Sequence, residues 1–155
     1  MSSTFTNLLF HVVYSTKYRE PLIQPAWSER LFEYIGGIIR GERGILLEIN
    51  GTADHLHLLA KLSPTIAVSD MLRLIKTNSS KWVHEERLAG PEFQWQTGYG
   101  GFSVSQSQVD RVRQYIENQQ QHHRQQPFKE EFLGLLRKHN IEFDERYVFE
   151  EEHIV

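Results

Sequence analysis

Two histidines separated by one residue, His55 and His57, are the first feature of the sequence with a clear chemical meaning. They lie in an apolar run typical of a β-strand, and alternate residues of a strand project from the same face. Two imidazoles on one face are two of the three ligands of a facial metal site, suited to Mn, Zn, Fe or, less readily, Mg. An isolated pair of this kind is more often two ordinary strand histidines, so other ligands must be sought.

Tyr115 and Gln119 form a second pair, four residues apart. On a helix this spacing stacks the two side chains on the same side. Gln119 then offers an amide oxygen to a metal, with the phenol oxygen of Tyr115 beside it. Taken alone, the pair also fits a boundary tyrosine next to a buried stripe formed by Val112 and Ile116.

The elements that position these pairs follow from hydrophobic period and turn residues. We predict strands at 5–15, 45–50, 55–62 and 93–105, and helices at 26–40, about 69–87, 109–119 and 128–139. Ser107 and Asp110 resemble a capping box at the start of the third helix. The order predicts an α+β, ferredoxin-like split βαβ sandwich, an antiparallel sheet with helices on one face and an appended C-terminal helix that carries Tyr115.

The length of 155 residues predicts one compact domain. We expect residues 1–126 to form the main unit with the Tyr115 helix. Residues 127–155 then add a last helix and an acidic tail to the same domain. The polar stretch 119–126 is either a hinge for the Tyr115 helix or a plain linker.

Composition excludes several kinds of site. The chain has no cysteine, which excludes disulfides, thiolate zinc sites and a cysteine nucleophile. Its apolar runs are too short to cross a bilayer and no export signal is visible, so we expect a cytoplasmic protein without membrane contact. The cluster Gly98 to Gly101 lacks the ending of a phosphate-binding P-loop, which argues against a nucleotide cofactor.

The charge distribution neither favours nor excludes DNA. The net charge is −3, but residues 142–155 hold six acidic residues against Arg146, so residues 1–141 carry a net charge of +2.

Three motifs in the right order carry a resemblance that covers nearly the whole chain. His55-Leu56-His57 after Gly51 to Asp54, the run 95–105 and the run 112–119 closely resemble the TnpA-like, single-tyrosine HUH transposases of bacterial insertion sequences (IS200-like). The stretch 11–18 is also similar to that family. The resemblance implies a ferredoxin-like fold, one divalent ion, Mg²⁺ or Mn²⁺, held by His55, His57 and Gln119, and Tyr115 as the catalytic nucleophile.

The resemblance also implies a substrate and an assembly. Members bind single-stranded DNA with hairpin ends, and cleave and rejoin strands through a 5′-phosphotyrosine intermediate. They act as homodimers, and in several members the histidines and the tyrosine of one site come from different subunits.

The residues that contact DNA are a separate prediction from composition. Trp95, Tyr99 and Phe102 are candidates to stack on unpaired bases, although each such aromatic also fits a core position. The better phosphate-binding candidates are Arg73, Lys76, Lys81, Arg111, Arg113 and Arg124.

Three other functions fit part of the pattern. A domesticated hairpin-DNA-binding protein of the same fold would bind without transposing. A hydrolytic phosphodiesterase would need paired H-x-T/S motifs, and this chain has a single H-x-H. Rolling-circle replication initiators share the HUH site but usually have longer chains.

Overall fold

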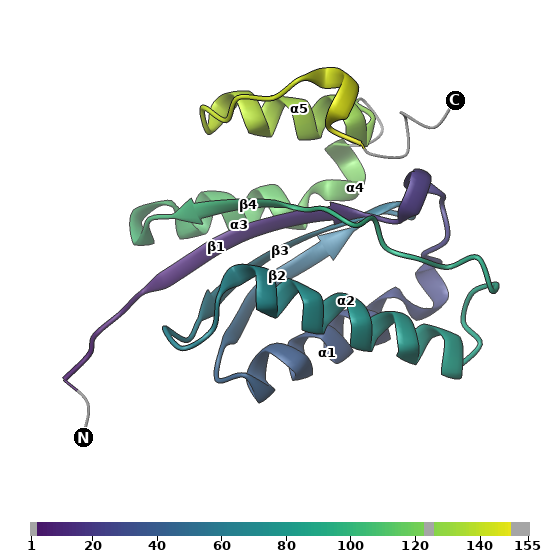
Figure 1. Ribbon diagram of the computed structural model, residues 1–155, viewed down its shortest axis with the longest axis horizontal. Helices are drawn as coiled ribbons and strands as arrows, with labels where there is room; N and C mark the ends of the chain where they lie inside the picture. Colours follow the sequence, from purple (N-terminus) through teal and green to yellow (C-terminus); the bar gives the residue numbers. More distant parts are fainter. Residues whose placement is uncertain (1–2, 123–125, 150–155) are drawn as a thin grey trace.

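A four-stranded antiparallel sheet is the centre of the computed structural model, which describes residues 3–122 and 126–149 (Figure 1). The strands lie in the order β2-β3-β1-β4. Two crossover helices, α1 and α2, connect β1 to β2 and β3 to β4, which confirms the predicted α+β, ferredoxin-like class. The bounds are β1 Leu8–Ser15, α1 Pro25–Gly41, β2 Ile45–Gly51, β3 His55–Leu62, α2 Val68–Glu85 and β4 Gly100–Val104.

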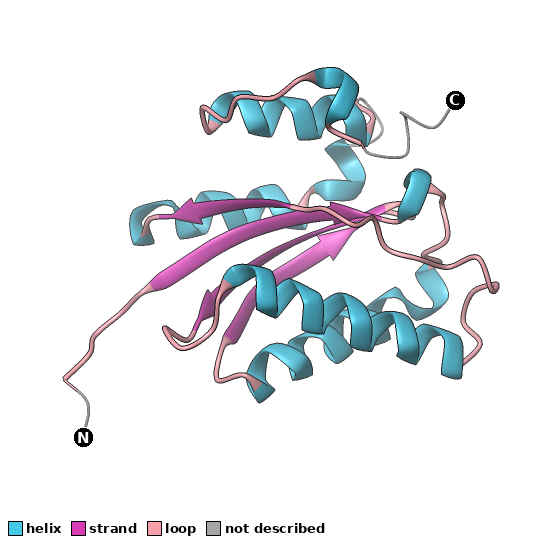
Figure 2. Ribbon diagram, viewed as in Figure 1, coloured by secondary structure: helices cyan, strands magenta, loops and turns pink. Residues whose placement is uncertain are grey.

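One face of the sheet packs on α1 and α2, which lie below it in Figure 2. Alternation along β3 directs Leu56, Leu58 and Ala60 into this core. The helix α1 contributes a buried stripe at three- and four-residue steps, Trp27, Leu31, Ile35 and Ile39. None of the described helices is long and apolar enough to span a membrane.

The opposite face is covered by the helices that follow β4, namely α3 Val109–Glu117, α4 Gln119–His122 and α5 Phe128–Lys138. Val109 and Ile116 of α3 pack on Leu9 and Leu59. The apolar side of α5 packs on Val13 and Phe102 of the sheet through Phe128, Phe132, Leu133, Leu135 and Leu136. His55 and His57 also point to this face, because they alternate with Leu56 and Leu58. The histidines therefore lie between the sheet and the C-terminal helices.

A tight turn from Gly51 to His55 joins β2 to β3. Thr52 donates its backbone N–H to the carbonyl of His55 over 3.0 Å. A Cβ on Gly51 would collide with the same carbonyl, so this position requires glycine. The turn pairs Asn50 with His57 and thereby fixes the register of the histidines.

The predicted strand 93–105 is wrong in its first half, since only Gly100–Val104 pairs as a strand. Trp95 makes a single bridge to Thr16. The ammonium of Lys76 instead donates hydrogen bonds to three neighbouring carbonyls, those of Gln96, Thr97 and Gly98, and so ties this segment to α2.

The third helix also begins differently from the prediction. A 3₁₀ turn, Gln106–Gln108, precedes α3, and the cap residue Gln108 makes no side-chain capping bond. Ser107 bonds to Ser105 over 3.1 Å, so the expected capping box is not formed. Two further 3₁₀ turns are Lys17–Arg19 and Glu145–Tyr147.

Candidate active site and metal centre

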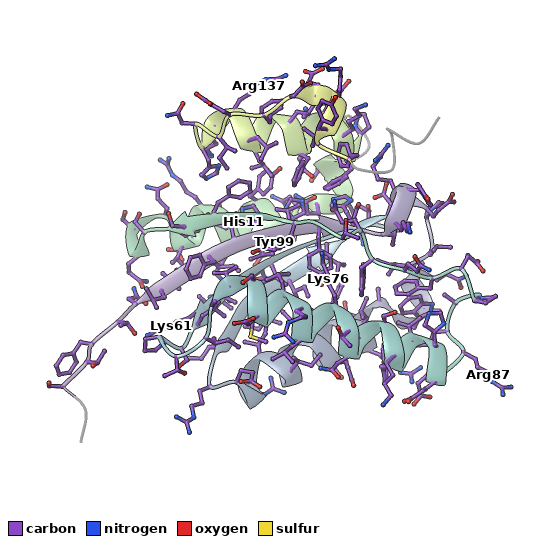
Figure 3. The ribbon with its side chains drawn as sticks, viewed as in Figure 1. His11, Lys61, Lys76, Arg87, Tyr99 and Arg137 are labelled. Atoms are coloured by element: carbon purple, nitrogen blue, oxygen red, sulfur yellow. The ribbon has the colours of Figure 1, made fainter. Side chains whose placement is uncertain are left out.

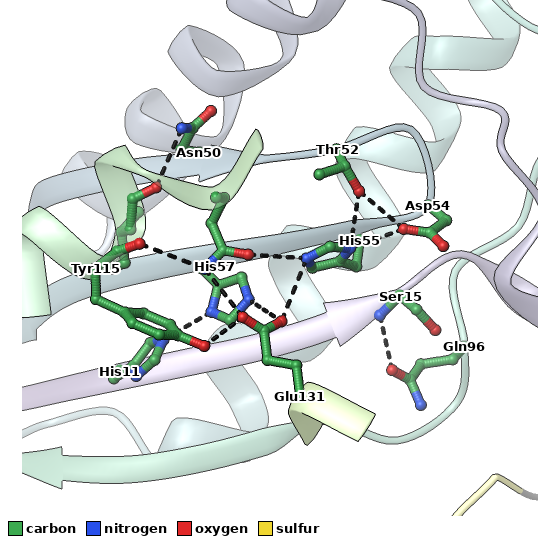
Figure 4. A network of polar contacts seen from close by, with 12 residues as sticks. His11, Ser15, Asn50, Thr52, Asp54, His55, His57, Gln96, Tyr115 and Glu131 are labelled. Carbon is green, nitrogen blue, oxygen red and sulfur yellow. Dashed lines mark hydrogen bonds and ion pairs between the residues drawn. The ribbon is translucent and has the colours of Figure 1, made fainter. Parts of the chain in front are cut away.

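The four residues singled out by spacing, His55, His57, Tyr115 and Gln119, meet on one face of the sheet (Figure 4). Both histidines and Gln119 are 0% exposed. The His55 Nε2 atom lies 3.1 Å from the Gln119 Oε1 atom. A facing helix amide and two strand imidazoles thus converge inside one chain.

The end of the tyrosine helix is fixed by Asn50 of β2. Its side-chain amide donates to the carbonyls of Ile116, over 3.1 Å, and Glu117, over 3.0 Å. These are carbonyls that the end of a helix leaves without helical partners. The chain turns at Asn118, and α4 begins with Gln119. Because Asn50 is the register partner of His57, one strand pair positions both the histidines and the helix end.

Glu131 of α5 is a fifth polar residue in the site, and the sequence reasoning missed it. Its Oε1 atom lies 2.9 Å from His57 Nε2 and 3.5 Å from His55 Nε2. Its Oε2 atom accepts hydrogen bonds from the Tyr115 hydroxyl and from Gln119 Nε2, the latter over 3.1 Å. The signal in the sequence was a carboxylate at a core position, since Glu131 lies between Phe128 and Phe132 on the buried side of α5.

Two further residues missed from sequence orient the imidazoles. Asp54 lies 2.7 Å from His55 Nδ1 and accepts a bond from the Thr52 hydroxyl over 2.9 Å, so Nδ1 of His55 carries the proton and Nε2 presents its lone pair inward. His11 Nε2 lies 2.9 Å from His57 Nδ1. Burial first, and then the neighbouring His57, lower the pKa of His11 to about 3, so His11 is neutral and able to accept a proton from His57 Nδ1. The Nε2 atoms of both strand histidines then face the centre of the site.

The Tyr115 hydroxyl is protonated in this arrangement. Burial first, and then the hydrogen bond to Glu131, raise the pKa of Tyr115 above its usual value. Its ring packs edge-on against His11 and His57, with centroids 6.0 and 5.6 Å away. The phenol oxygen therefore lies beside the imidazole pair.

The donor set fits a divalent cation. One nitrogen each from His55 and His57 and one oxygen from Glu131 lie within 4.8 Å of one another, and Gln119 adds an amide oxygen. Imidazole nitrogen with carboxylate and amide oxygen suits ions such as Mn²⁺ and, with more oxygen ligands, Mg²⁺. The arrangement can hold such an ion next to a hydroxyl, the combination needed to work on a phosphate ester.

A cleft of about 510 Å³ opens at Tyr115 between β4, α3 and α5. Arg111 and Lys138 supply positive charge on opposite helices, and His139 stacks on Phe102 with ring centroids 4.2 Å apart. The predicted phosphate contact Arg111 therefore lies in the same cleft as Tyr115. Phe102 itself is buried in the core.

A second groove of about 510 Å³ lies on the other side of the sheet, between α2 and residues 94–99. It brings together four predicted DNA-contact residues, Arg73, Lys76, Trp95 and Tyr99. Lys76 reaches from α2 toward Tyr99 (Figure 3), and burial lowers the pKa of Lys76 to about 8. Trp95 is buried and donates to Ser79 Oγ over 3.0 Å, which leaves Tyr99 as the more accessible ring.

Among the described candidates for phosphate binding, the side chains of Arg73, Lys81 and Arg113 are exposed on the surface. Arg124 falls outside the described residues. The others form ion pairs, Arg73 with Asp70 at 3.1 Å, Lys81 with Glu85 at 3.8 Å and Arg113 with Glu48 at 3.6 Å.

Sequence comparison finds transposases among the relatives of this chain. The family described as "Transposase IS200 like" matches residues 4–119. The transposase for insertion sequence element IS200 of Salmonella typhimurium is 27% identical over 129 residues, which are 77% of this chain and 81% of that protein. The ISDra2 transposase TnpA of Deinococcus radiodurans is 24% identical over 118 residues, covering 72% of this chain and 84% of that protein.

Solved structures show the same fold. A putative transposase from Deinococcus radiodurans matches with a TM-score of 0.62 and 23% identity, covering 77% of this chain and 95% of that one. A REP-associated tyrosine transposase bound to a REP hairpin matches with a TM-score of 0.57 and 14% identity, covering 76% of this chain and 72% of that one. The imidazole, amide and phenol groups of this site thus stand on a fold shared with solved transposases, and the chain belongs to the IS200-like transposase family.

Proposed function

We propose that this transposase is a single-tyrosine HUH enzyme that cleaves and rejoins single-stranded DNA through a covalent bond to Tyr115. One observation carries the proposal. The Tyr115 hydroxyl and the inward-facing groups of His55, His57 and Gln119 converge within one chain around a shared centre. Polar side chains that converge from distant parts of the sequence are candidates for one functional site.

The proposed metal ligands are His55, His57 and Gln119, and the proposed ion is Mg²⁺ or Mn²⁺. When bound, the ion supplies charge neutralisation at a phosphodiester oxygen. The protein contributes dry, oriented ligands, because Asp54 and His11 fix which nitrogen of each ring points inward.

Tyr115 is the proposed nucleophile. Its oxygen forms a bond to the scissile phosphorus and loses its proton, while the bond from phosphorus to the 3′ oxygen breaks and leaves a free 3′-hydroxyl. The product is a 5′-phosphotyrosine, which retains the energy of the cleaved linkage. A second 3′-hydroxyl attacks this bond in reverse and rejoins a strand, so no nucleotide cofactor is required.

The proposed substrate is single-stranded DNA with a hairpin. The REP-associated transposase was solved with a hairpin bound, and this chain has two grooves lined with cations. We propose that the cleft with Arg111 receives the strand to be cut. The groove with Arg73, Lys76 and Tyr99 is proposed to hold the hairpin, with Lys81, Arg113 and Arg124 as outer phosphate contacts.

We further propose a homodimer that acts on cytoplasmic DNA. Because one chain already brings His55, Gln119 and Tyr115 together, the arrangement supports a resting site complete within each subunit. Mass measurement by light scattering across a concentration series tests the dimer.

A labelled single-stranded hairpin oligonucleotide tests the chemistry. With Mn²⁺ or Mg²⁺ present, the protein is expected to form a covalent adduct that survives denaturing electrophoresis. Tyr115→Phe should lose the adduct, whereas Tyr147→Phe, at an exposed tyrosine on a terminal turn, should retain it.

The main alternative is a domesticated hairpin-binding protein of the same fold. Tight, metal-independent hairpin binding with no adduct under any metal condition would support that alternative and contradict the transposase chemistry.

A further inference from the structure

We infer that Glu131 is a fourth ligand of the metal and that helix α5 is therefore part of the metal centre. The inference rests on the proposed metal site and extends it to a residue beyond the segment 4–119 that matches the family. Glu131 also bonds to Tyr115, so the same carboxylate would link the ion to the proposed nucleophile.

The separations between donor atoms are those of ligands around one ion. Two donors bound at about 2.1 Å are roughly 3.0 Å apart in an octahedral arrangement and roughly 3.4 Å apart in a tetrahedral one. Glu131 Oε1 lies 2.9 Å from His57 Nε2 and 3.5 Å from His55 Nε2, and His55 Nε2 lies 3.1 Å from Gln119 Oε1. These separations match those expected for Glu131 Oε1 as one more donor around a shared ion.

The protonation pattern also favours a cation at this point. With its proton on Nδ1, the His55 ring directs the Nε2 lone pair toward the oxygens of Gln119 and Glu131. The Gln119 orientation is set by its other atom, since Nε2 donates to Glu131 Oε2 over 3.1 Å. Three electron-rich atoms then face one another in a buried space, and a divalent ion would balance them.

The supporting helix holds the carboxylate firmly. Glu131 is 5% exposed, and α5 is anchored on both sides of it by Phe128 and Phe132. The Phe128 ring stacks on the His55 ring with centroids 4.4 Å apart. A ligand carried by a packed helix is held in position before the ion binds, so the site is preorganised.

The two oxygens of Glu131 have different neighbours. Oε1 faces the imidazoles, and Oε2 accepts from the Tyr115 hydroxyl. Glu131 is accordingly a positioning residue for Tyr115, because one of its oxygens holds the Tyr115 hydroxyl while the other faces the proposed ion. A carboxylate in the ligand set also adds a hard, anionic oxygen, which shifts preference toward Mn²⁺ and Mg²⁺.

Mn²⁺ binding by the full-length protein without DNA is the test, measured by calorimetry and by the spin-resonance signal of free Mn²⁺. Glu131→Gln retains the size and hydrogen-bonding atoms of the side chain but removes its charge, and is expected to weaken Mn²⁺ binding by about tenfold or more. Glu130→Gln, one position away on the exposed side of α5, should bind like the parent. Circular dichroism confirms that both variants fold.

Hydrogen exchange supplies a second readout. Mn²⁺ should slow exchange of the α5 amides in the parent protein and in Glu130→Gln, and should leave α5 unchanged in Glu131→Gln. Equal Mn²⁺ affinity in the parent and Glu131→Gln would overturn the inference. Faster DNA cleavage by Glu131→Gln at unchanged affinity would also overturn it, and would make Glu131 an obstruction.

The inference and the proposed function fail separately. If His57→Ala loses Mn²⁺ binding while Glu131→Gln does not, the metal site stands and only the fourth ligand is wrong. If the parent protein binds no Mn²⁺ or Mg²⁺, with or without hairpin DNA, the proposed metal-dependent function is wrong as well.

Discussion

His11 illustrates how a single residue determines what a neighbouring ligand can do. It lies behind His57, is 4% exposed and remains neutral over the pH range in which most histidines take a proton. A neutral ring can accept from His57 Nδ1 and leave His57 Nε2 available for a cation. A protonated ring could not, because it would donate at both nitrogens.

The pH dependence of stability follows from this burial. The unfolded chain protonates His11 near its ordinary pKa of 6.5, whereas the folded chain does so at about 3. The unfolded state therefore binds more protons between these values, and the free energy of unfolding falls as the pH falls, by up to about 1.4 kcal/mol per unit for this group. The groups facing His11 that raise or lower its pKa are His57, Glu131, His139 and Lys138.

Urea unfolding in chelator, at several pH values from about 4 inside this window to about 7 just above it, measures the effect. His11→Gln should reduce the slope of unfolding free energy against pH. The exposed His84→Gln is the matched control and should keep the parent slope. An unchanged slope in His11→Gln would contradict the assignment.

The predictability of the site from sequence differs between these residues. His55 with His57, and Tyr115 with Gln119, are pairs whose spacing places them on one face of a single stretch of backbone. Glu131 and His11 acquire their roles only when α5 and β1 pack against β3, and no local period records that packing. The sequence does contain one indication of Glu131, which is a charged residue at a position where the helix period predicts a buried apolar one.

Helix α5 brings Glu131 into the site and packs on the sheet through its aromatic side chains. This helix packs on β4 through a close contact between Phe132 and Gly100. An added Cβ at Gly100 would lie 2.8 Å from Phe132 Cε1 and 3.1 Å from Phe102 Cζ. The strand needs glycine here because the ring of the helix occupies the space of a side chain.

Gly100→Ala is therefore expected to push α5 from the sheet and to cost about 1–3 kcal/mol of stability. Gly98→Ala is a matched control, since nothing lies within 4 Å of its added Cβ. Thermal unfolding measures the stability, and hydrogen exchange of α5 locates the change. Equal stability of the two variants would mean that Phe132 moves aside at no cost.

The elements were largely predictable, and the exception has a physical cause. In α1, β3 and α5 the spacing of the apolar residues follows the buried face of the element, and this spacing can be read directly from the sequence. The segment 93–99 has the aromatic composition of a strand, but Lys76 from α2 binds its carbonyls and draws them away from the sheet. That competition arises between elements distant in the sequence.

The whole molecule has a net charge of −3, and its few cations matter by position. Arg111 stands in the cleft with Tyr115, opposite Lys138. Exposed cations already paired with carboxylates, such as Arg113 with Glu48 at 3.6 Å, gain less from a phosphate because a partner must be released. Strand binding should depend on a small number of phosphate contacts.

Arg111→Ala should weaken binding of a single-stranded hairpin oligonucleotide and reduce the slope of log affinity against log salt by about 1. Arg87→Ala, which removes an exposed cation at the far end of α2, should change neither (Figure 3). Fluorescence anisotropy at several salt concentrations gives both quantities. If the two variants had the same slope of log affinity against log salt, the DNA strand would not lie in the cleft with Arg111.

The two hydrogen bonds from Asn50 to the last carbonyls of α3 would affect any exchange of this helix between two subunits. If helix α3 of one subunit were to leave its own histidines and dock on the histidines of a second subunit, the two Asn50 hydrogen bonds would have to break first. Asn50→Ala, which removes both hydrogen bonds, would then be expected to speed exchange of the helix between subunits.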